Sequence, residues 1–258
     1  MAARIIAVYS MKGGVGKSSL AVNLAAMCAG AELRTLIWDV DAQGAAGFLL
    51  GHAGAGVAAA PKPKRGARRI FAKDGQAADG IVPTDIPDLD LIAADLSLRD
   101  LEAALDGDKP KRLRKLLAEL AADYDRIILD CPPGLGALSD QIFRAAELIV
   151  VPLVPAPLAL RTFEQVREHV VAEHGGGKGP ALMPVFSMVD RRKALHRELV
   201  AEHPAWPVIP MASVVERMAV EQKPLADFAG GTPAGVAVAE VWRRVEAALG
   251  PVAGGVKV

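Results

Sequence analysis

The 258-residue chain is 52% hydrophobic, and its 30 Lys and Arg balance its 30 Asp and Glu, so the formal net charge is zero. This length and composition are typical of one large α/β domain with an extensive core. The balanced charge excludes a general basic field, so any contact with nucleic acid has to come from local groups. Cys28 and Cys131 form neither a CxxC pair nor a metal-ligand set, so reduced thiols of a cytoplasmic protein are expected.

Residues 5–27 predict a phosphate-binding loop between a strand and a helix. The apolar run 5–8 reads as a buried strand, and apolar residues recur at helical spacing over 20–27. Glycines between them let backbone N–H groups approach phosphate oxygens, and the helix N-terminus adds partial positive charge. The residues expected to bind the nucleotide here are Lys12, Gly13, Gly14, Val15, Gly16, Lys17, Ser18 and Ser19.

Two side chains of this loop fit ATP with Mg²⁺. Lys17 is placed to reach the β- and γ-phosphates, and the Ser18 hydroxyl is placed to ligate Mg²⁺. A glycine-rich turn that binds nothing would not account for a Lys-Ser pair at the start of the helix. No uninterrupted apolar stretch reaches the ~20 residues that span a bilayer, and Lys12 and the glycines interrupt any signal-peptide pattern.

A second lysine, Lys12, opens the loop, although an ordinary phosphate loop needs only Lys17. The segment 12–18 resembles the deviant phosphate loop (deviant Walker A) of the ParA/MinD family of ATPases. The resemblance implies that Lys12 crosses a dimer interface to the partner subunit's nucleotide, where it would act like an arginine finger. A solvated surface lysine is the alternative.

Residues 34–41 predict a second buried strand that ends in carboxylates, at the edge where open α/β sheets bind ligands. The segment 39–44 resembles the family's DxDxQG element, with Ala42 where the family usually has proline. By this resemblance, Asp41 orients the attacking water, and Asp39 supports the Mg²⁺ shell or the strand end. A turn-capping carboxylate is the alternative for Asp39.

Residues 45–80 predict a loop or mobile insertion, whose basic cluster at 61–69 either contacts DNA or is simply solvated. A strand at 89–93 precedes a leucine-spaced helix over 95–102, where Ala93 to Asp95 replace the family's common Pro-Ala-polar group. A second basic group, 109–115, opens a helix whose leucines at 113, 116, 117 and 120 form its apolar side.

Residues 124–134 form the second motif. The apolar run 127–129 predicts a central parallel strand, and Asp130 at its end is expected to hold Mg²⁺, mostly through water, opposite Ser18. Residues 132–134 break the strand and predict a switch-like loop that senses the γ-phosphate. The segment resembles the family's Asp-Cys-Pro-Pro element, while the bridging cysteines of its iron–sulfur relatives are not matched.

The C-terminal half predicts strands at 145–154, 181–188 and 208–211, with helices over 160–171, 214–219 and 234–249. By resemblance, the ends of the last two strands hold the adenine. The residues implied are Met188, Asp190, Pro210 and Met211, for which ordinary core positions are the alternative.

The ParA branch of the family binds DNA non-specifically in its ATP state through surface Arg and Lys, and such binding weakens steeply with salt. The candidates are Arg191, Arg192, Lys193 and Arg197 in one group and Arg243 and Arg244 in another. Solvated helix faces are the alternative for both. The tail is too short and glycine-rich for the basic amphipathic helix by which MinD-type members reach membranes. The loop near residue 10 leaves no room for an N-terminal helix-turn-helix, so operator binding is not expected.

The predicted fold is a single-domain α/β P-loop NTPase over residues 1–250, with a mainly parallel twisted sheet, helices on both faces and a short flexible tail at 251–258. The resemblance implies a cytoplasmic, nucleoid-associated ATPase that forms an ATP-bound homodimer. It would partition or position a plasmid, a chromosome region or a protein assembly, with slow hydrolysis stimulated by a ParB-like partner or cargo adaptor. The alternatives are an ATP-binding regulator acting through a protein partner or a membrane (MinD-like) without DNA binding, and a metabolic ligase or kinase of the wider superfamily.

Overall fold

An eight-stranded sheet organises the computed structural model, which describes residues 3–52, 67–72, 75–100, 111–174 and 179–250. The strand order is β3-β4-β2-β5-β1-β6-β7-β8. All neighbouring strands are parallel except β3 and β4. The strands are β1 (Arg4–Val8), β2 (Thr35–Asp39), β3 (Ile81–Pro83), β4 (Leu89–Ile92), β5 (Arg126–Asp130), β6 (Leu148–Leu153), β7 (Ala181–Val189) and β8 (Val208–Pro210).

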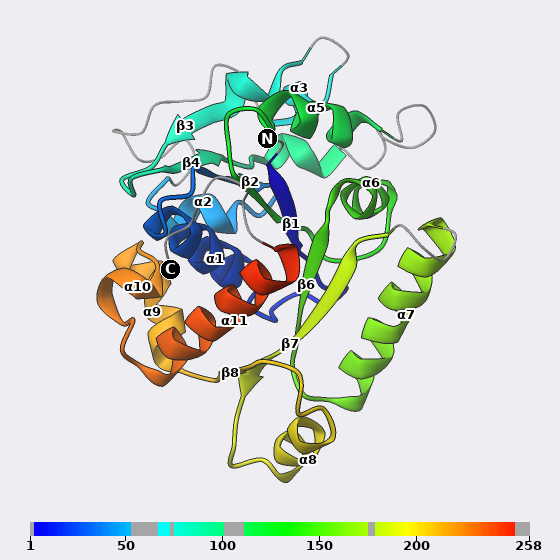
Figure 1. Ribbon diagram of the computed structural model, residues 1–258, viewed down its shortest axis with the longest axis vertical. Coiled ribbons are helices and arrows are strands. Elements are labelled where there is room, and N and C mark those ends of the chain that lie inside the picture. The colour runs from blue at the N-terminus through cyan, green and yellow to red at the C-terminus, as the bar shows by residue number, and fades with distance from the viewer. Residues whose placement is uncertain (1–2, 53–66, 73–74, 101–110, 175–178, 251–258) are drawn as a thin grey trace.

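Helices cover both faces of this sheet (Figure 1). One face carries α1 (Lys17–Gly30), α2 (Ala45–Leu49), α9 (Ser213–Glu221), α10 (Leu225–Phe228) and α11 (Pro233–Leu249). The other carries α5 (Arg112–Leu120), α6 (Ala137–Ala145), α7 (Pro157–His174) and α8 (Ala194–Glu202). The short turns α3 (Ala67–Ile70), η1 (Ala77–Gly80) and η2 (Leu96–Asp100) also pack on this second face.

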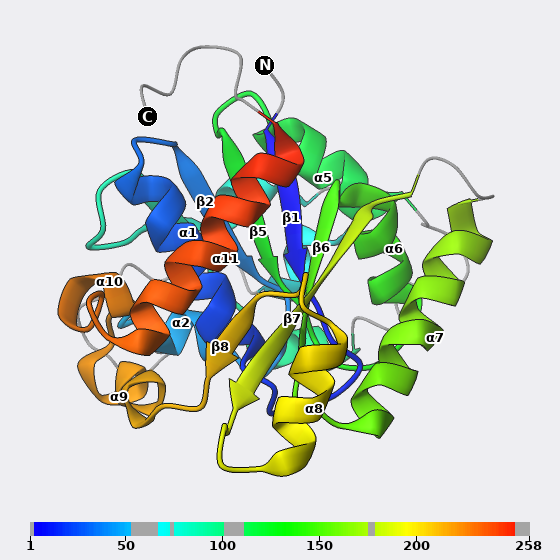
Figure 2. The ribbon, with the colours of Figure 1, turned by 60° about the horizontal axis from the view of Figure 1, so that its bottom comes forward.

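The sheet separates two hydrophobic cores. Ile6 and Val8 of β1 point into the core under α1, whereas Ala7 of β1 and Tyr9, the next residue after the strand, point into the core under α5 and α6. Because the central strands are buried on both faces, they read in the sequence as continuous apolar runs. Figure 2 shows α11 lying beside α1 across one face of the sheet.

The predicted mainly parallel sheet with helices on both faces is confirmed. Three local expectations differ. Part of the 45–80 segment, predicted as loop, forms α2, α3 and η1, while the edge strand β3 that follows it and the helix α6 were not predicted. In place of the helix expected over 95–102, the described residues form a 3-10 turn at 96–100, and residues 101 and 102 lie outside the described residues. Most of the basic cluster 61–69, part of the group 109–115 and the tail 251–258 lie outside the described residues.

Candidate nucleotide-binding site

The loop between β1 and α1 has the backbone of an anion-binding turn. Gly14 and Gly16 have φ angles of +72° and +87°, a conformation that side-chain-bearing residues rarely adopt. Gly16 is the N-cap of α1 and offers no side-chain cap, so the first N–H groups of the helix stay available to an anion. A Cβ added at Gly13 or Gly14 would meet no atom within 4 Å, so these positions are open to a ligand.

Lys17 begins α1 and has a buried side chain. Its Nζ lies 3.5 Å from the Lys12 carbonyl oxygen, which is a long hydrogen bond to a neutral acceptor. Its positive charge lowers the pKa of Asp130, so the ammonium and that carboxylate face the same space. A buried ammonium without a close anionic partner is suited to bind a phosphate.

Asp130 ends β5 and is fully buried, yet neither of its carboxylate oxygens has a hydrogen-bond partner among the described residues. Burial raises the pKa of Asp130 to about 7, while the Ser18 hydroxyl and Lys17 act in the opposite direction. Ser18 lies near the carboxylate, but no hydrogen bond of ordinary distance and angle joins them. An unpartnered carboxylate beside a hydroxyl is an oxygen donor set that fits Mg²⁺.

Asp39 ends the adjacent strand β2, and both of its oxygens are engaged. Oδ1 accepts the Asp41 N–H at 3.1 Å, and Oδ2 accepts the Ala46 and Gly47 N–H groups at 3.0 and 3.4 Å. Asp39 thereby caps the start of α2. Burial and the Asp130 charge raise its pKa. These contacts favour the strand-end role over the metal role, which stays a prediction.

The other two predicted catalytic side chains lie at the same edge of the sheet. Asp41 follows β2, and its Oδ1 accepts the Gln43 N–H at 2.9 Å. The negative charge of Asp41 also raises the pKa of Asp130. Lys12 is half-buried, and its ammonium has no hydrogen-bond partner within the described parts of the chain. The structure therefore brings the predicted phosphate, metal and catalytic residues together where β1, β2 and β5 end.

A cleft with a volume of about 80 Å³ opens between α1, α9 and the ends of β7 and β8. Of the four residues predicted to hold adenine, it is lined by Met188, Pro210 and Met211 but not by Asp190. Asp190 instead forms a two-pronged ion pair with Arg192, which lowers the pKa of Asp190 to about 2. Met188 has a φ of +55°, a strained conformation of the kind that concentrates at functional sites.

The same cleft includes residues that the sequence analysis missed. They are Leu20, Asn23, Ser187, Ile209, Ala212, Val215, Glu216, Leu225 and Val238. Gly16 and Ser19, which were predicted to bind nucleotide, line the cleft as well. The available signal was the position of the 214–219 helix directly after the last strand, which brings its first turn to the ligand-binding edge. Asn23 ties the cleft walls together, because its amide binds the Ser19 carbonyl (2.7 Å), Met218 Sδ (3.2 Å) and the Leu225 N–H (2.8 Å).

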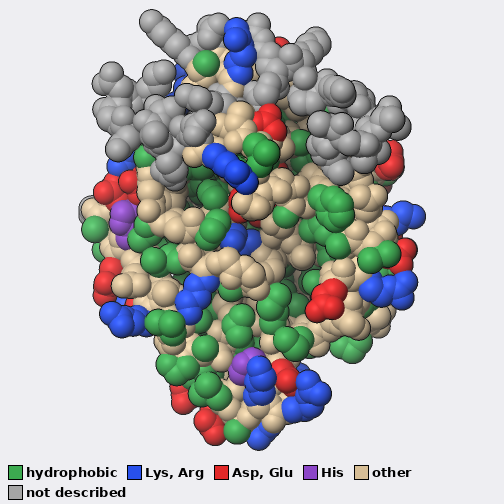
Figure 3. All heavy atoms as spheres, turned by 180° about the vertical axis from the view of Figure 1, so that it is seen from behind, with side chains coloured by type: hydrophobic (Ala, Val, Ile, Leu, Met, Phe, Trp, Pro, Cys, Tyr) green, Lys and Arg blue, Asp and Glu red, His purple; other side chains and the backbone are tan. Residues whose placement is uncertain are grey.

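The predicted DNA-binding residues lie outside this site and differ in how free they are. Figure 3 shows Lys and Arg side chains gathered at the end of the molecule where Figure 1 places α8. Arg192 is paired with Asp190, and Arg197 donates to the backbone carbonyls of residues 191 and 192 at 2.8 and 3.1 Å. Arg243 and Arg244 are paired with Glu240. Arg191 and Lys193 have no ion-pair partner among the residues described.

A strand, a glycine loop and a helix that begins with Lys17, together with the buried Asp130 at the end of β5, define a P-loop NTPase. Within the described ranges, no helix has the length and apolar composition needed to cross a bilayer. A family model described as an AAA domain matches residues 3–173.

Curated relatives match most of the chain. ParA of Myxococcus xanthus, a chromosome partitioning protein, is 34% identical over 204 residues, which cover 77% of this chain and 70% of the relative. The sporulation initiation inhibitor Soj of Bacillus subtilis is 32% identical over 203 residues, covering 77% and 78%. The chain therefore belongs to the ParA family of P-loop ATPases.

Solved structures agree with this fold. Cobyrinic acid a,c-diamide synthase of Mycobacterium smegmatis, with bound ATP analogue and magnesium, has a TM-score of 0.75 at 25% identity, and the match covers 94% of both chains. A plasmid partition protein of Borrelia burgdorferi bound to AMPPNP has a TM-score of 0.79 at 19% identity, covering 95% of this chain and 100% of that one.

Proposed function

We propose that the chain is a partitioning ATPase that dimerises with ATP, binds non-specific DNA in that state, and positions a cargo. The observation that carries the proposal is the buried, unpartnered carboxylate of Asp130 facing Lys17 and Ser18 at the phosphate loop. The chromosome partitioning protein among its relatives supports a role in partitioning.

ATP and Mg²⁺ are the ligands of the site. The N–H groups at the start of α1 and the Lys17 ammonium bind the β- and γ-phosphates, and Ser18 and Asp130 hold the metal ion. When bound, Mg²⁺ supplies neutralisation of the charge that develops on the phosphate oxygens. Asp41 orients the attacking water, for which its Oδ2 is free of the backbone contact made by Oδ1.

Purine recognition is assigned to the cleft beside α9. Pro210 has no N–H, the Met211 N–H is donated to the Val189 carbonyl at 3.0 Å, and the Asn23 NH₂ group is already donated to the Ser19 carbonyl and Met218 Sδ. The carbonyl oxygens of residues 210 and 211 are therefore suited to accept from the 6-amino group of adenine. Asp190, held by Arg192 outside the cleft, contributes by fixing the end of β7 rather than by contacting the base.

A homodimer that closes over the nucleotide is supported by apolar side chains exposed around the site. Leu135, Leu158, Leu195 and Met211 each follow the carboxyl end of a strand, so they lie on the edge that carries the phosphate loop. Exposed apolar side chains gathered around one site are typical of a protein interface. Lys12, half-buried at this edge, would act on the partner subunit's nucleotide.

DNA contact is assigned first to Arg191 and Lys193, because these two exposed cations are not committed to a carboxylate within the described structure. Arg192 and Arg197 shape the turn that presents them. Neutralisation of the DNA backbone by such residues is independent of sequence.

The ATPase domain occupies residues 1–250, followed by the tail 251–258. In the cell, the ATP-bound dimer would sit on the nucleoid and return to the cytoplasm after hydrolysis. A ParB-like protein or a cargo adaptor would stimulate that step.

The experiment measures binding of an Asp41→Ala protein to non-specific duplex DNA, with ATP and then with ADP, across a salt series. If Asp41 orients the water, this variant accumulates as the ATP dimer. ATP-dependent binding that weakens steeply with salt supports the proposal. If sizing shows a dimer but neither nucleotide state binds DNA, the DNA-binding part of the proposal is wrong, and a regulator acting through a protein partner or a membrane is favoured. Liposome sedimentation then distinguishes a membrane-binding regulator from one that acts through a protein partner.

A further inference from the structure

The chain contains two tyrosines, and Tyr9 lies between the phosphate loop and the loop that follows β5. It is the first residue after β1, and its side chain is fully buried. Its backbone N–H donates to the Val150 carbonyl of β6 at 3.0 Å. The sheet therefore fixes the position of Tyr9, independently of the two loops beside it.

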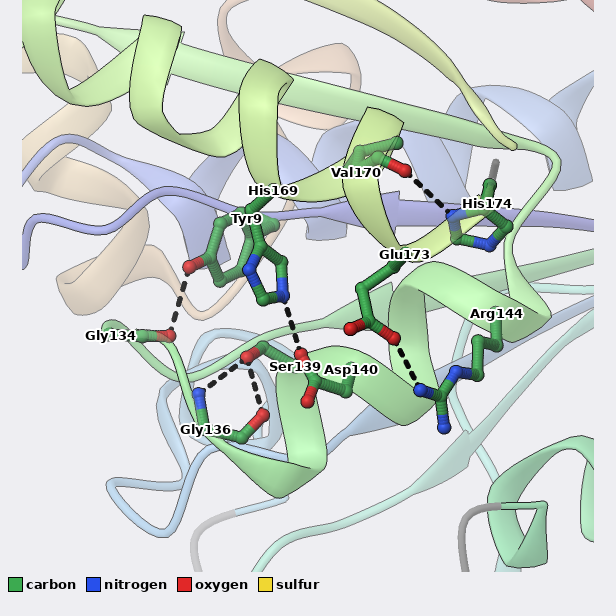
Figure 4. Close-up of polar contacts among 10 residues, drawn as sticks. All are labelled: Tyr9, Gly134, Gly136, Ser139, Asp140, Arg144, His169, Val170, Glu173 and His174. Atoms are coloured by element: carbon green, nitrogen blue, oxygen red, sulfur yellow. Dashed lines mark hydrogen bonds and ion pairs between the residues drawn. The ribbon is translucent and has the colours of Figure 1, made fainter. Parts of the chain in front are cut away.

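The Tyr9 hydroxyl reaches across to the second loop and donates a 2.9 Å hydrogen bond to the Gly134 carbonyl oxygen (Figure 4). A carbonyl can only accept, so the phenol is the donor. Burial raises the pKa of Tyr9, and the charges of Cys131 and Asp140 act in the same direction, so the phenol keeps its proton.

This bond holds the middle of the loop 131–136. The ends are anchored separately, since the Cys131 N–H donates to the Val8 carbonyl at 3.2 Å and the Gly136 N–H donates to Ser139 Oγ at 2.7 Å. Between them, residues 132–135 make no other hydrogen bond to the described parts of the chain. Two of these four residues are prolines, which have no N–H to donate.

The Tyr9 ring cannot follow the loop if the loop moves. Its edge packs against Phe143 of α6, with centroids 4.9 Å apart and planes at 88°. The Phe143 ring in turn packs against the His169 ring of α7, with centroids 6.0 Å apart. His169 Nε2 lies 2.7 Å from Asp140 Oδ1 (Figure 4). These contacts hold the Tyr9 ring in place, so its hydroxyl can position the loop.

We propose that Tyr9 is a positioning residue whose hydroxyl holds the 131–136 loop in place beside Asp130 while ATP is hydrolysed. The proposal rests on the proposed ATPase site and adds to it a group outside the phosphate loop. Because the phosphate loop itself binds the phosphates, loss of the Tyr9 hydroxyl affects kcat and leaves ATP affinity unchanged.

Tyr9→Phe removes this hydroxyl and keeps the ring. Tyr124→Phe is the matched control, because the Tyr124 hydroxyl also makes a side-chain hydrogen bond, to Asp90 Oδ2 at 2.7 Å, at the opposite end of the sheet. Tyr9→Phe should lower kcat about fivefold, the factor for one neutral hydrogen bond of ~1 kcal/mol, with KM for ATP unchanged. Tyr124→Phe should change neither constant.

Amide hydrogen exchange without nucleotide gives a second readout that needs no hydrolysis. The amides of residues 134–136 should exchange faster in Tyr9→Phe than in the wild type and in Tyr124→Phe. Equal exchange in all three proteins, a parallel rise in KM, or an equal loss of kcat in Tyr124→Phe would each overturn the proposal. If the wild type hydrolyses no ATP, the ATPase proposal fails, and the exchange comparison alone decides the role of Tyr9.

Discussion

Asp39 and Asp130 occupy paired positions at the carboxyl ends of the adjacent strands β2 and β5, but they are engaged differently. Asp39 accepts three backbone N–H groups, whereas Asp130 has no hydrogen-bond donor among the described residues. The two carboxylates therefore differ in what they bind. Asp39 caps α2, whereas both oxygens of Asp130 lack a donor in the described structure, which supports the metal role proposed for Asp130.

The stability of the metal-free protein should fall as pH rises from about 4 to about 7. Burial raises the pKa of Asp130 from 3.8 to about 7 in the folded chain. Its contribution to stability is fully present below the unfolded pKa and is lost as pH rises through the folded pKa. In EDTA, urea unfolding should give a free energy of unfolding that falls by on the order of 1 kcal/mol per pH unit between about pH 4 and pH 7, and that levels off above pH 7.

Asp130→Asn is the control for this pH dependence, since the amide does not titrate. Its free energy of unfolding should vary less between pH 4 and 7 than that of the wild type. Mg²⁺ with ADP at pH 8 should stabilise the wild type more than the variant. The same slope in both proteins would assign the effect to another group, of which Asp39 is the first candidate because its pKa is also raised.

Arg112 on α5 should be a major source of stability for the chain at residues 70, 72 and 75. Its buried Nη2 donates to the carbonyl oxygens of Ile70, Ala72 and Gly75 at 2.9, 2.6 and 2.6 Å. Arg112→Met keeps the apolar stem but leaves these acceptors without their shared donor, and should cost roughly 2–4 kcal/mol in urea unfolding. Arg114→Met, at an exposed position of the same helix, should cost less than about 0.5 kcal/mol. An equal loss of stability in the two variants would show that the three hydrogen bonds of Arg112 contribute little.

The parts that the sequence predicts well are those with local signals. The signal for the glycine loop and Lys17 lies in residues that are adjacent in the chain. The signal for Asp130 is its position at the end of an apolar run, which reflects the burial of β5 on both faces. α2 was missed because it is only five residues long and is capped by Asp39 from the preceding strand. β3 was missed because a three-residue edge strand has too little pattern to read.

Other features depend on contacts that no local pattern encodes. The Tyr9 hydroxyl meets Gly134 across 125 positions of sequence, so nothing near Tyr9 predicts it. Likewise, the predicted basic groups looked equivalent until their partners were known. The structure commits Arg192 to Asp190 and places Arg243 and Arg244 beside Glu240.

The two basic groups should therefore differ in DNA binding. The double variant Arg191→Ala/Lys193→Ala removes two uncommitted cations, and should weaken ATP-dependent DNA retention and reduce the salt slope by about 2. Arg243→Ala/Arg244→Ala removes the same charge from residues already paired with Glu240, and should have a smaller effect. Fluorescence anisotropy across a salt series measures both. A larger loss in the second variant would move the interface to α11.

Lys12 should act in trans, and mixing two inactive variants tests this directly. Lys12→Ala lacks the second lysine but keeps Asp41, while Asp41→Ala keeps Lys12 but lacks the residue proposed to orient water. Each alone should lose hydrolysis by on the order of 100-fold or more. ATP binding should persist in both, because Lys17 and the start of α1 are intact.

In a mixed dimer, the nucleotide on the Lys12→Ala subunit meets both its own Asp41 and the Lys12 of the other subunit. One site of the two is then complete. Random mixing should restore about a quarter of wild-type activity, because half of the dimers are mixed and each has one working site. If Lys12 acts on its own subunit's nucleotide, no site in any dimer is complete and the mixture stays inactive. Sizing in the presence of ATP must find dimers of both single variants, so that an inactive mixture argues against trans action rather than against dimerisation.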